Sequence, residues 1–193
     1  MMMETERFEA LIDAILAIII TIIVLEIPLA PTGTWEALFD LRYEFIIYAI
    51  SFLVCFNFWN VNNNIFSLVN KIDPKVIWTM GFTLLIFSLL PYLTTFVAEN
   101  FYEFFPQFLY GLSFLITAFL SELIFHFLIK SDPGNIALRL TLGNSKIVLQ
   151  TIVLVSAGMI IGYLFYPPAI LICCLLSIVL PWILPKIKNL LGK

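Results

Sequence analysis

The chain has 193 residues, of which 62% are hydrophobic and 12% charged, and its formal net charge is −3. With a mean hydropathy of +1.04 it has more apolar surface than a soluble core of this length buries, so we predict an all-α integral membrane protein. The scattered basic residues argue against nucleic acid as a partner, and the absence of a Gly-rich phosphate loop, HExxH or GxSxG argues against an enzyme.

Six apolar runs are each long enough to cross about 30 Å of hydrocarbon at about 1.5 Å per residue. They are residues 8–29, 45–68, 76–97, 104–129, 147–166 and 169–187. Proline-containing turns are expected at residues 28–31, 73–74 and 167–168. The longest polar segment, residues 131–145, is too short for a soluble domain, so residues 1–193 are interpreted as one six-helix transmembrane domain.

The first run contains a regular stripe of side chains. Steps of three and four residues join Ile18, Thr21, Ile22 and Leu25, which places them on one face of a helix. Taken alone, such a stripe is typical of a lipid-facing or a core surface.

Three charged residues frame this stripe. Arg7 and Asp13 are six residues apart and lie on different sides of a helix, so each needs partners elsewhere. We expect Asp13 to accept hydrogen bonds from a neighbouring helix and to act as a packing lock. Glu26, at the end of the run, either meets water or supplies a cation-attracting ring at an outer mouth.

The second run is rich in asparagine. Asn57, Asn60 and Asn64 share one helical face, and Asn62 and Asn63 lie beside them. This face is expected to meet another helix or water rather than lipid, with a polar seam between helices favoured over a ligand site.

The fourth run contains the only histidine of the chain, His126, four residues after Glu122 and therefore on the same face. Ionisable residues within a membrane are candidates for function, and this pair motivates an alternative prediction, a proton-coupled membrane transporter. The pair is also consistent with simple hydrogen bonding to each other or to a neighbouring helix.

Small residues and cysteines of the later runs suggest packing. Gly158 and Gly162, in GMIIG of the fifth run, predict a close approach of two helices. The three cysteines, Cys55, Cys173 and Cys174, lie in apolar runs and are expected to be buried hydrophobes, with no metal and no cofactor.

The basic residues predict the orientation. Nine of the ten lie in the two terminal segments and the even-numbered loops, and only Arg42 lies on the other side. Under the positive-inside rule both termini are cytoplasmic.

The first run also carries a family resemblance. It rests on Arg7, Ala10, Asp13, Ala17, Ile18, Thr21, Leu25, Glu26 and Ile27, followed by Pro28. At this spacing they resemble the first-helix signature of the bacterial relatives of the lysosomal potassium channel called transmembrane protein 175. Phe58-Trp59 in the second run and LLPYLT at residues 89–94 are similar to that family as well.

The sequence departs from this family at two places. Leu11 and Ile12 precede Asp13 where the family usually has Phe-Ser, and Asn62 and Asn63 stand where it usually has a histidine.

The resemblance implies a homotetrameric potassium channel, weakly selective over sodium, in a bacterial plasma membrane. Four first helices would line a central pore that conducts K⁺ without a TVGYG filter. The implied pore gate is Ile18, Ile22 and Leu25, the implied selectivity residue is Thr21, and the implied helix-locking network is Arg7, Asp13, Trp59, Asn62 and Asn63.

Overall fold

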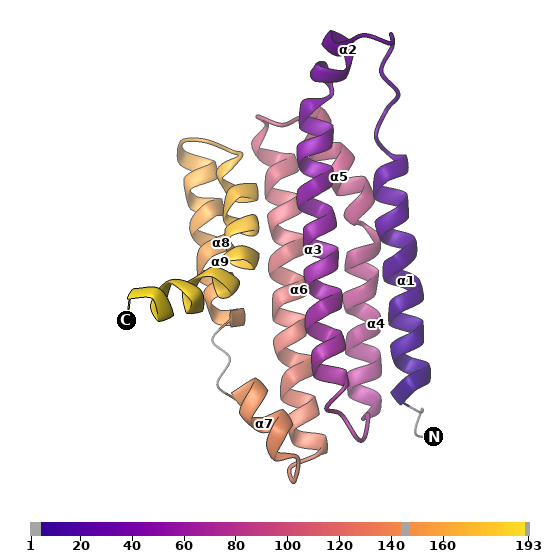
Figure 1. Ribbon diagram of the computed structural model, residues 1–193, viewed down its shortest axis with the longest axis vertical. Helices are drawn as coiled ribbons and strands as arrows, with labels where there is room; N and C mark the ends of the chain where they lie inside the picture. Colours follow the sequence, from indigo (N-terminus) through magenta and orange to yellow (C-terminus); the bar gives the residue numbers. More distant parts are fainter. Residues whose placement is uncertain (1–4, 144–146, 192–193) are drawn as a thin grey trace.

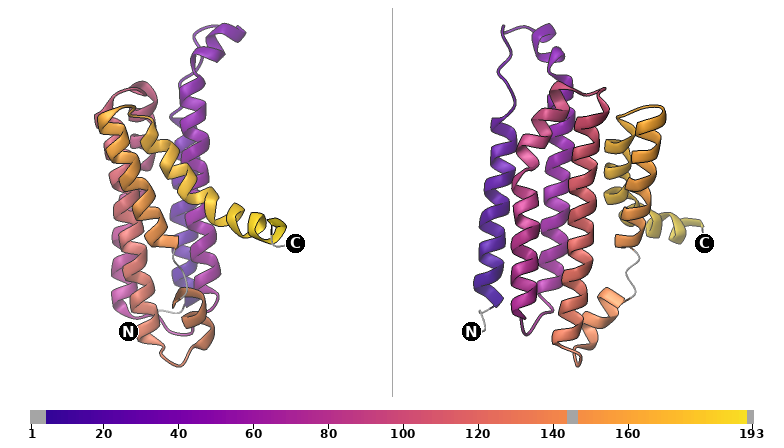
Figure 2. Two further views of the ribbon diagram at one scale, coloured as in Figure 1. Left: turned by 90° about the vertical axis from the view of Figure 1, so that its left-hand side faces the viewer. Right: turned by 180° about the vertical axis from the view of Figure 1, so that it is seen from behind.

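The computed structural model describes residues 5–143 and 147–191, and within these ranges every regular element is a helix (Figure 1). The helices are α1 (Thr5–Leu25), α2 (Trp35–Asp40), α3 (Arg42–Phe66), α4 (Pro74–Ser88), α5 (Leu90–Glu99), α6 (Phe104–Ser131), α7 (Ile136–Gly143), α8 (Ile147–Leu164) and α9 (Ala169–Leu191). Helices α1, α3, α4 and α6 stand side by side, with α1 at one edge and the α8–α9 hairpin at the other (Figures 1 and 2).

Five stretches of the described chain are long and apolar enough to cross a membrane, which confirms a membrane protein but not the sixth span. They are Glu6–Leu25, Arg42–Phe66, Pro74–Glu99, Phe104–Ser131 and Ile136–Leu164, the last of which has α7 and α8 as its described parts. The predicted sixth span corresponds to α9, whose apolar described part, Ala169–Ile183, is shorter than the other five. Helix α9 contains Pro181, which lacks the N–H for a helical hydrogen bond, and its C-terminal part turns away from the bundle (Figure 2).

The third predicted run, 76–97, consists of two helices that meet at Leu89. Pro91 has no N–H to donate to the carbonyl one turn earlier, and its ring crowds that carbonyl, so the helix is interrupted just before it. The Leu89 N–H bonds instead to Ile86 O, at 3.1 Å. Hydropathy does not reveal this break, because both pieces are apolar.

The segment that we predicted as a polar loop, 131–145, contains the helix α7. Asn135 fixes its start, because the Oδ1 atom accepts a hydrogen bond from the Leu138 N–H at 3.0 Å. The Nδ2 atom of Asn135 donates to Leu68 O at 2.7 Å, which ties α7 to the end of α3. Leu138 is fully buried, so α7 packs against the bundle rather than projecting from it.

Two predicted turns are confirmed by their local structure. Asp73 caps α4 by accepting a hydrogen bond from the Lys75 N–H at 2.7 Å, and Pro74 occupies the first helical turn, where its missing N–H has no cost. Pro167 and Pro168 form the short turn between α8 and α9.

The α8–α9 hairpin is held by close packing at two glycines. A Cβ atom on Gly158 would lie 2.7 Å from the Cβ of Cys173, and one on Gly162 would lie 2.7 Å from Cγ1 of Ile170. Both distances are shorter than real carbon contacts, so only glycine allows this approach. The packing role predicted for GMIIG is confirmed.

One face of α1 forms part of the core. Phe8, Ile12, Leu16, Ile19 and Ile23 recur at steps of three and four residues, and all are buried. They pack against α3, α4 and α5. The opposite face of α1 is therefore left largely uncovered by the described part of the subunit.

Candidate functional site: the outer face of the first helix and its anchor

The predicted stripe of α1 lies on the face that the subunit does not cover. Ile18 is 58% exposed, Ile22 37% and Leu25 80%, and Thr21 between them is exposed as well. The next residues along the helix, Ile19 and Ile23, point into the core instead. Because α1 is at the edge of the bundle (Figure 1), this apolar stripe faces either lipid or another protein surface.

The hydroxyl group of Thr21 donates a hydrogen bond within α1. Its Oγ1 donates to the carbonyl oxygen of Ile18 at 2.8 Å. A hydroxyl oxygen that has donated its proton still has lone pairs, which accept hydrogen bonds or coordinate a cation. The exposed stripe of α1 thus carries one hydroxyl oxygen with free lone pairs between apolar side chains.

Asp13 ties α1 to α3. The indole Nε1–H of Trp59 donates to Oδ1 of Asp13 at 2.9 Å. The Trp59 ring also contacts Phe56, with ring centroids 5.6 Å apart. An acidic side chain near one end of α1 is therefore bonded to the neighbouring helix, by an indole rather than by an amide.

The other residues of the implied locking network make different contacts. Asn62 and Asn63 line a gap of about 10 Å³ next to Asp13 and Trp59. The Asn62 amide donates to the Phe58 carbonyl of its own helix at 2.7 Å, and Asn63 is exposed. Arg7 is exposed and does not line this gap.

Glu26 directly follows the end of α1. Its N–H still bonds to Ile22 O at 3.2 Å, and its side chain is exposed. The carboxylate therefore stands at the same end of α1 as Leu25.

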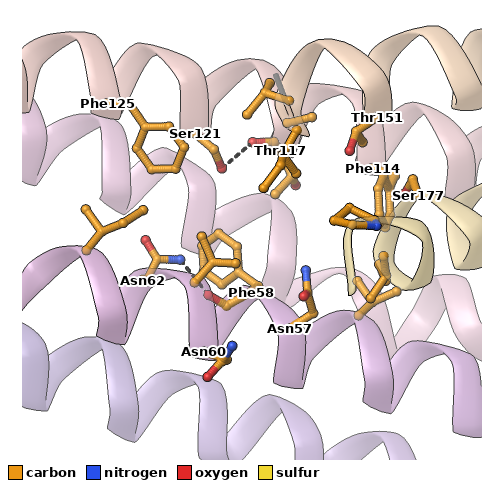
Figure 3. Close-up of a pocket in the computed structure, with 18 of the residues that line it drawn as sticks. Asn57, Phe58, Asn60, Asn62, Phe114, Thr117, Ser121, Phe125, Thr151 and Ser177 are labelled. Carbon is orange, nitrogen blue, oxygen red and sulfur yellow. Dashed lines mark hydrogen bonds between the residues drawn. The ribbon is translucent and has the colours of Figure 1, made fainter. Parts of the chain in front are cut away.

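The asparagine face of α3 opens on a cavity of about 440 Å³, rather than on a closed polar seam (Figure 3). Asn57, Asn60, Asn62 and Asn64 line it from α3. Hydroxyl side chains line it from the other helices: Ser113, Thr117 and Ser121 of α6, Thr141 of α7, Thr151 of α8 and Ser177 of α9. The hydroxyls at residues 113, 117 and 121 recur every fourth residue, a pattern that our sequence analysis missed.

Glu122 and His126 do not belong to this cavity. Both side chains are exposed on α6, and neither is among the residues that line the cavity. A proton path through the cavity would require Glu122 and His126 to lie next to the asparagine residues of α3. The described structure does not place them there. Among the described side chains, no cluster of histidine, cysteine and acidic residues is suited to hold a metal ion.

A buried hydroxyl cluster joins three helices elsewhere in the bundle. Ser51 Oγ of α3 lies 2.8 Å from Thr94 Oγ1 of α5 and 3.0 Å from the Tyr110 hydroxyl of α6. All three side chains are buried. The cluster is a second feature absent from our sequence analysis, because serine, threonine and tyrosine in separate runs show no common spacing.

These features define a helical membrane protein whose first helix is anchored to the bundle and exposes an apolar stripe. Comparison with known proteins relates it to a family. Residues 7–91, which include most of α1 and all of α3, match the family model described as endosomal/lysosomal potassium channel TMEM175.

Individual relatives extend this similarity over the chain. A protein of Chryseobacterium sp. (strain P1-3), named as a potassium channel, is 27% identical over 183 residues, 95% of this chain and 94% of the relative. A potassium channel of Streptomyces collinus is 31% identical over 102 residues, 51% of this chain and half of the relative.

A solved structure shares the fold. The crystal structure of a lysosomal potassium-selective channel TMEM175 homolog from Chamaesiphon minutus superposes with a TM-score of 0.66 at 24% identity, covering 91% of this chain and 95% of that one. These matches confirm the resemblance seen in the first helix: the chain is similar to the TMEM175 family model over residues 7–91 and to a relative named as a potassium channel over nearly its whole length.

Proposed function

We propose that the chain is the subunit of a homotetrameric, weakly selective potassium channel in a bacterial plasma membrane, with four copies of α1 around a central pore. The observation that carries the proposal is the uncovered stripe of Ile18, Thr21, Ile22 and Leu25 on α1. Four such stripes turned inward would cover one another and enclose a narrow path. The similarity of residues 7–91 to the TMEM175 model supports it, since these residues include the stripe.

The chemistry of the stripe fits a gated cation path. Rings of Ile18, Ile22 and Leu25 would form a hydrophobic constriction that closes by dewetting, because an ion there loses hydration without compensation. The Thr21 ring would provide four hydroxyl oxygens to replace part of the K⁺ hydration shell, and the bond from Thr21 to Ile18 O orients them. A single ring of neutral oxygens discriminates weakly between K⁺ and Na⁺, so modest selectivity is expected.

The flanking residues complete the proposed pore. The bond between Asp13 and Trp59 would hold the base of α1 while the stripe faces the axis. Asn62 and Asn63 border the same contact, and Arg7 lies beyond it towards the N-terminus. Glu26 would form a ring of carboxylates at the opposite mouth and raise the local cation concentration. With nine basic residues on one side of the membrane, both termini are cytoplasmic in this proposal.

Flux measurements on purified protein in liposomes test the proposal. We expect K⁺ to move down its gradient without a coupled ion, faster than Na⁺, and the particle mass to correspond to four chains. Absence of flux at every tested pH and voltage, or transport only when a proton gradient drives it, would refute the channel.

Two substitutions test the residues of the stripe. Thr21→Ala should change the K⁺/Na⁺ permeability ratio, whereas Thr95→Ala should not, although Thr95 also bonds a carbonyl of its own helix. Ile18→Asn should increase the leak current of the closed channel by wetting the constriction. The same change at Ile160, an exposed residue of α8, should leave the leak unchanged. An unchanged ratio or an unchanged leak would remove the corresponding residue from the pore.

A further inference from the structure

The cavity of about 440 Å³ is open on one side and lies apart from the exposed face of α1, because the residues that line it come from α3 to α9 (Figure 3). Its volume falls within the range of about 300–1,000 Å³ that is typical of small-molecule sites. The outer face of α1 contributes nothing to its wall.

Several polar groups on this wall have no hydrogen-bond partner in the described part of the chain. Among the described residues, no hydrogen bond is made by the side chains of Asn57, Thr117 or Thr151. By contrast, Ser121 and Ser177 donate their protons to carbonyl oxygens of their own helices. A polar group without a partner is costly within a membrane, so these three side chains favour an occupant that forms hydrogen bonds.

The rest of the wall limits the chemistry of that occupant. Aromatic and aliphatic side chains, among them Phe58, Phe114 and Phe125, form the apolar part. None of the described residues that line the cavity is acidic, basic or histidine. A charged ligand would therefore lose its hydration without gaining a counter-charge, whereas an uncharged one with an apolar body would not.

We propose that this cavity binds a neutral amphiphile, a molecule with one hydroxyl or similar hydrogen-bonding head and an aliphatic body. The head bonds to Asn57, Thr117 or Thr151, and the body packs against the phenylalanine side chains. An aliphatic alcohol represents this class.

Photolabelling of the purified, assembled protein in lipid nanodiscs tests the proposal, with octanol carrying a diazirine as the probe. We expect saturable labelling of the peptides that contain Asn57 and Thr117, located by mass spectrometry and suppressed by excess unlabelled octanol. Octanoate and octylammonium, which have the same body but a charged head, should compete poorly.

Variants distinguish binding of octanol at a specific site from general partitioning of octanol into the membrane. Ala118→Phe fills the cavity and should reduce the saturable labelling at least about tenfold, since volume for the probe is lost. Ala49→Phe makes the same change at an exposed residue of α3 that does not line the cavity, and should have no effect. Thr117→Val and Thr151→Val keep the side-chain shape, and the loss of each hydrogen bond should weaken octanol binding about three- to tenfold.

Three results would overturn the proposal. Labelling that does not saturate, or that is equal in both threonine variants and the parent, would mean that no specific site exists. A co-purified phospholipid that octanol does not displace would make the cavity a lipid site. Labelling only of dissociated single chains would mean that a second copy of the chain fills the cavity.

Discussion

Replacing Trp59 by phenylalanine isolates the contact between α1 and α3. The indole N–H that donates to Asp13 at 2.9 Å is lost, whereas an aromatic ring remains to contact Phe56. The substitution thus removes one hydrogen bond and changes little of the packing around it.

The size of the effect follows from the type of bond. A hydrogen bond to a charged group contributes about 1.5–3 kcal/mol, and the exposure of the Asp13 side chain favours the lower end, about 1.5 kcal/mol. For a chain of this size that corresponds to a fall in Tm of about 3–6 °C. Asp13→Asn keeps an acceptor oxygen but removes the charge, so it should cost about half as much.

Thermal unfolding of the purified protein, followed by fluorescence, measures these differences. Trp78→Phe is the matched control, because Trp78 is exposed on α4 and donates no hydrogen bond to a described residue. The double variant Asp13→Asn, Trp59→Phe should be no less stable than Trp59→Phe alone. Equal Tm values for Trp59→Phe and Trp78→Phe, or additive losses in the double variant, would refute the reasoning.

Two further predictions concern packing and buried hydroxyls. Gly158→Ala should lower stability by about 1–3 kcal/mol, because the new Cβ would meet Cys173 at 2.7 Å, whereas Gly81→Ala, with nothing within 4 Å, should be neutral or stabilising. Equal Tm values for these two variants would contradict the close packing of α8 and α9. Ser51→Ala should cost about 1–3 kcal/mol by leaving the buried Tyr110 hydroxyl without its partner, and an unchanged unfolding midpoint would contradict this.

The sequence predicts the class, five of the membrane spans and the two faces of α1, because these features depend on hydropathy and helical periodicity. Two pairs of isoleucines on α1 have the same spacing of four residues: Ile18 with Ile22, and Ile19 with Ile23. Only the second pair is buried. Periodicity therefore defines both faces but does not identify which one the subunit covers. The stripe that the family resemblance assigned to the pore lies on the exposed face of the described chain, and its role in a pore stays a prediction.

Features that depend on tertiary contacts were not predictable in the same way. Helix α7 is too short for a periodic signal, and its position depends on the bond from Asn135 to Leu68 O. The interruption before Pro91 separates two equally apolar pieces. The sequence indicated that the asparagine residues of α3 need partners, but the cavity that they border is formed with six other helices, α4 to α9.

Helix α3 contributes both to the wall of the cavity and to the attachment of α1, and this affects how experiments are designed. Trp59, which bonds to α1, lies only two residues after Asn57 and one before Asn60, both on the wall of the cavity. A helix moves as a nearly rigid rod over such a distance, so displacement of this turn by a molecule in the cavity also displaces the attachment point of α1. Binding in the cavity and ion flux are therefore variables to be recorded together on the same variants.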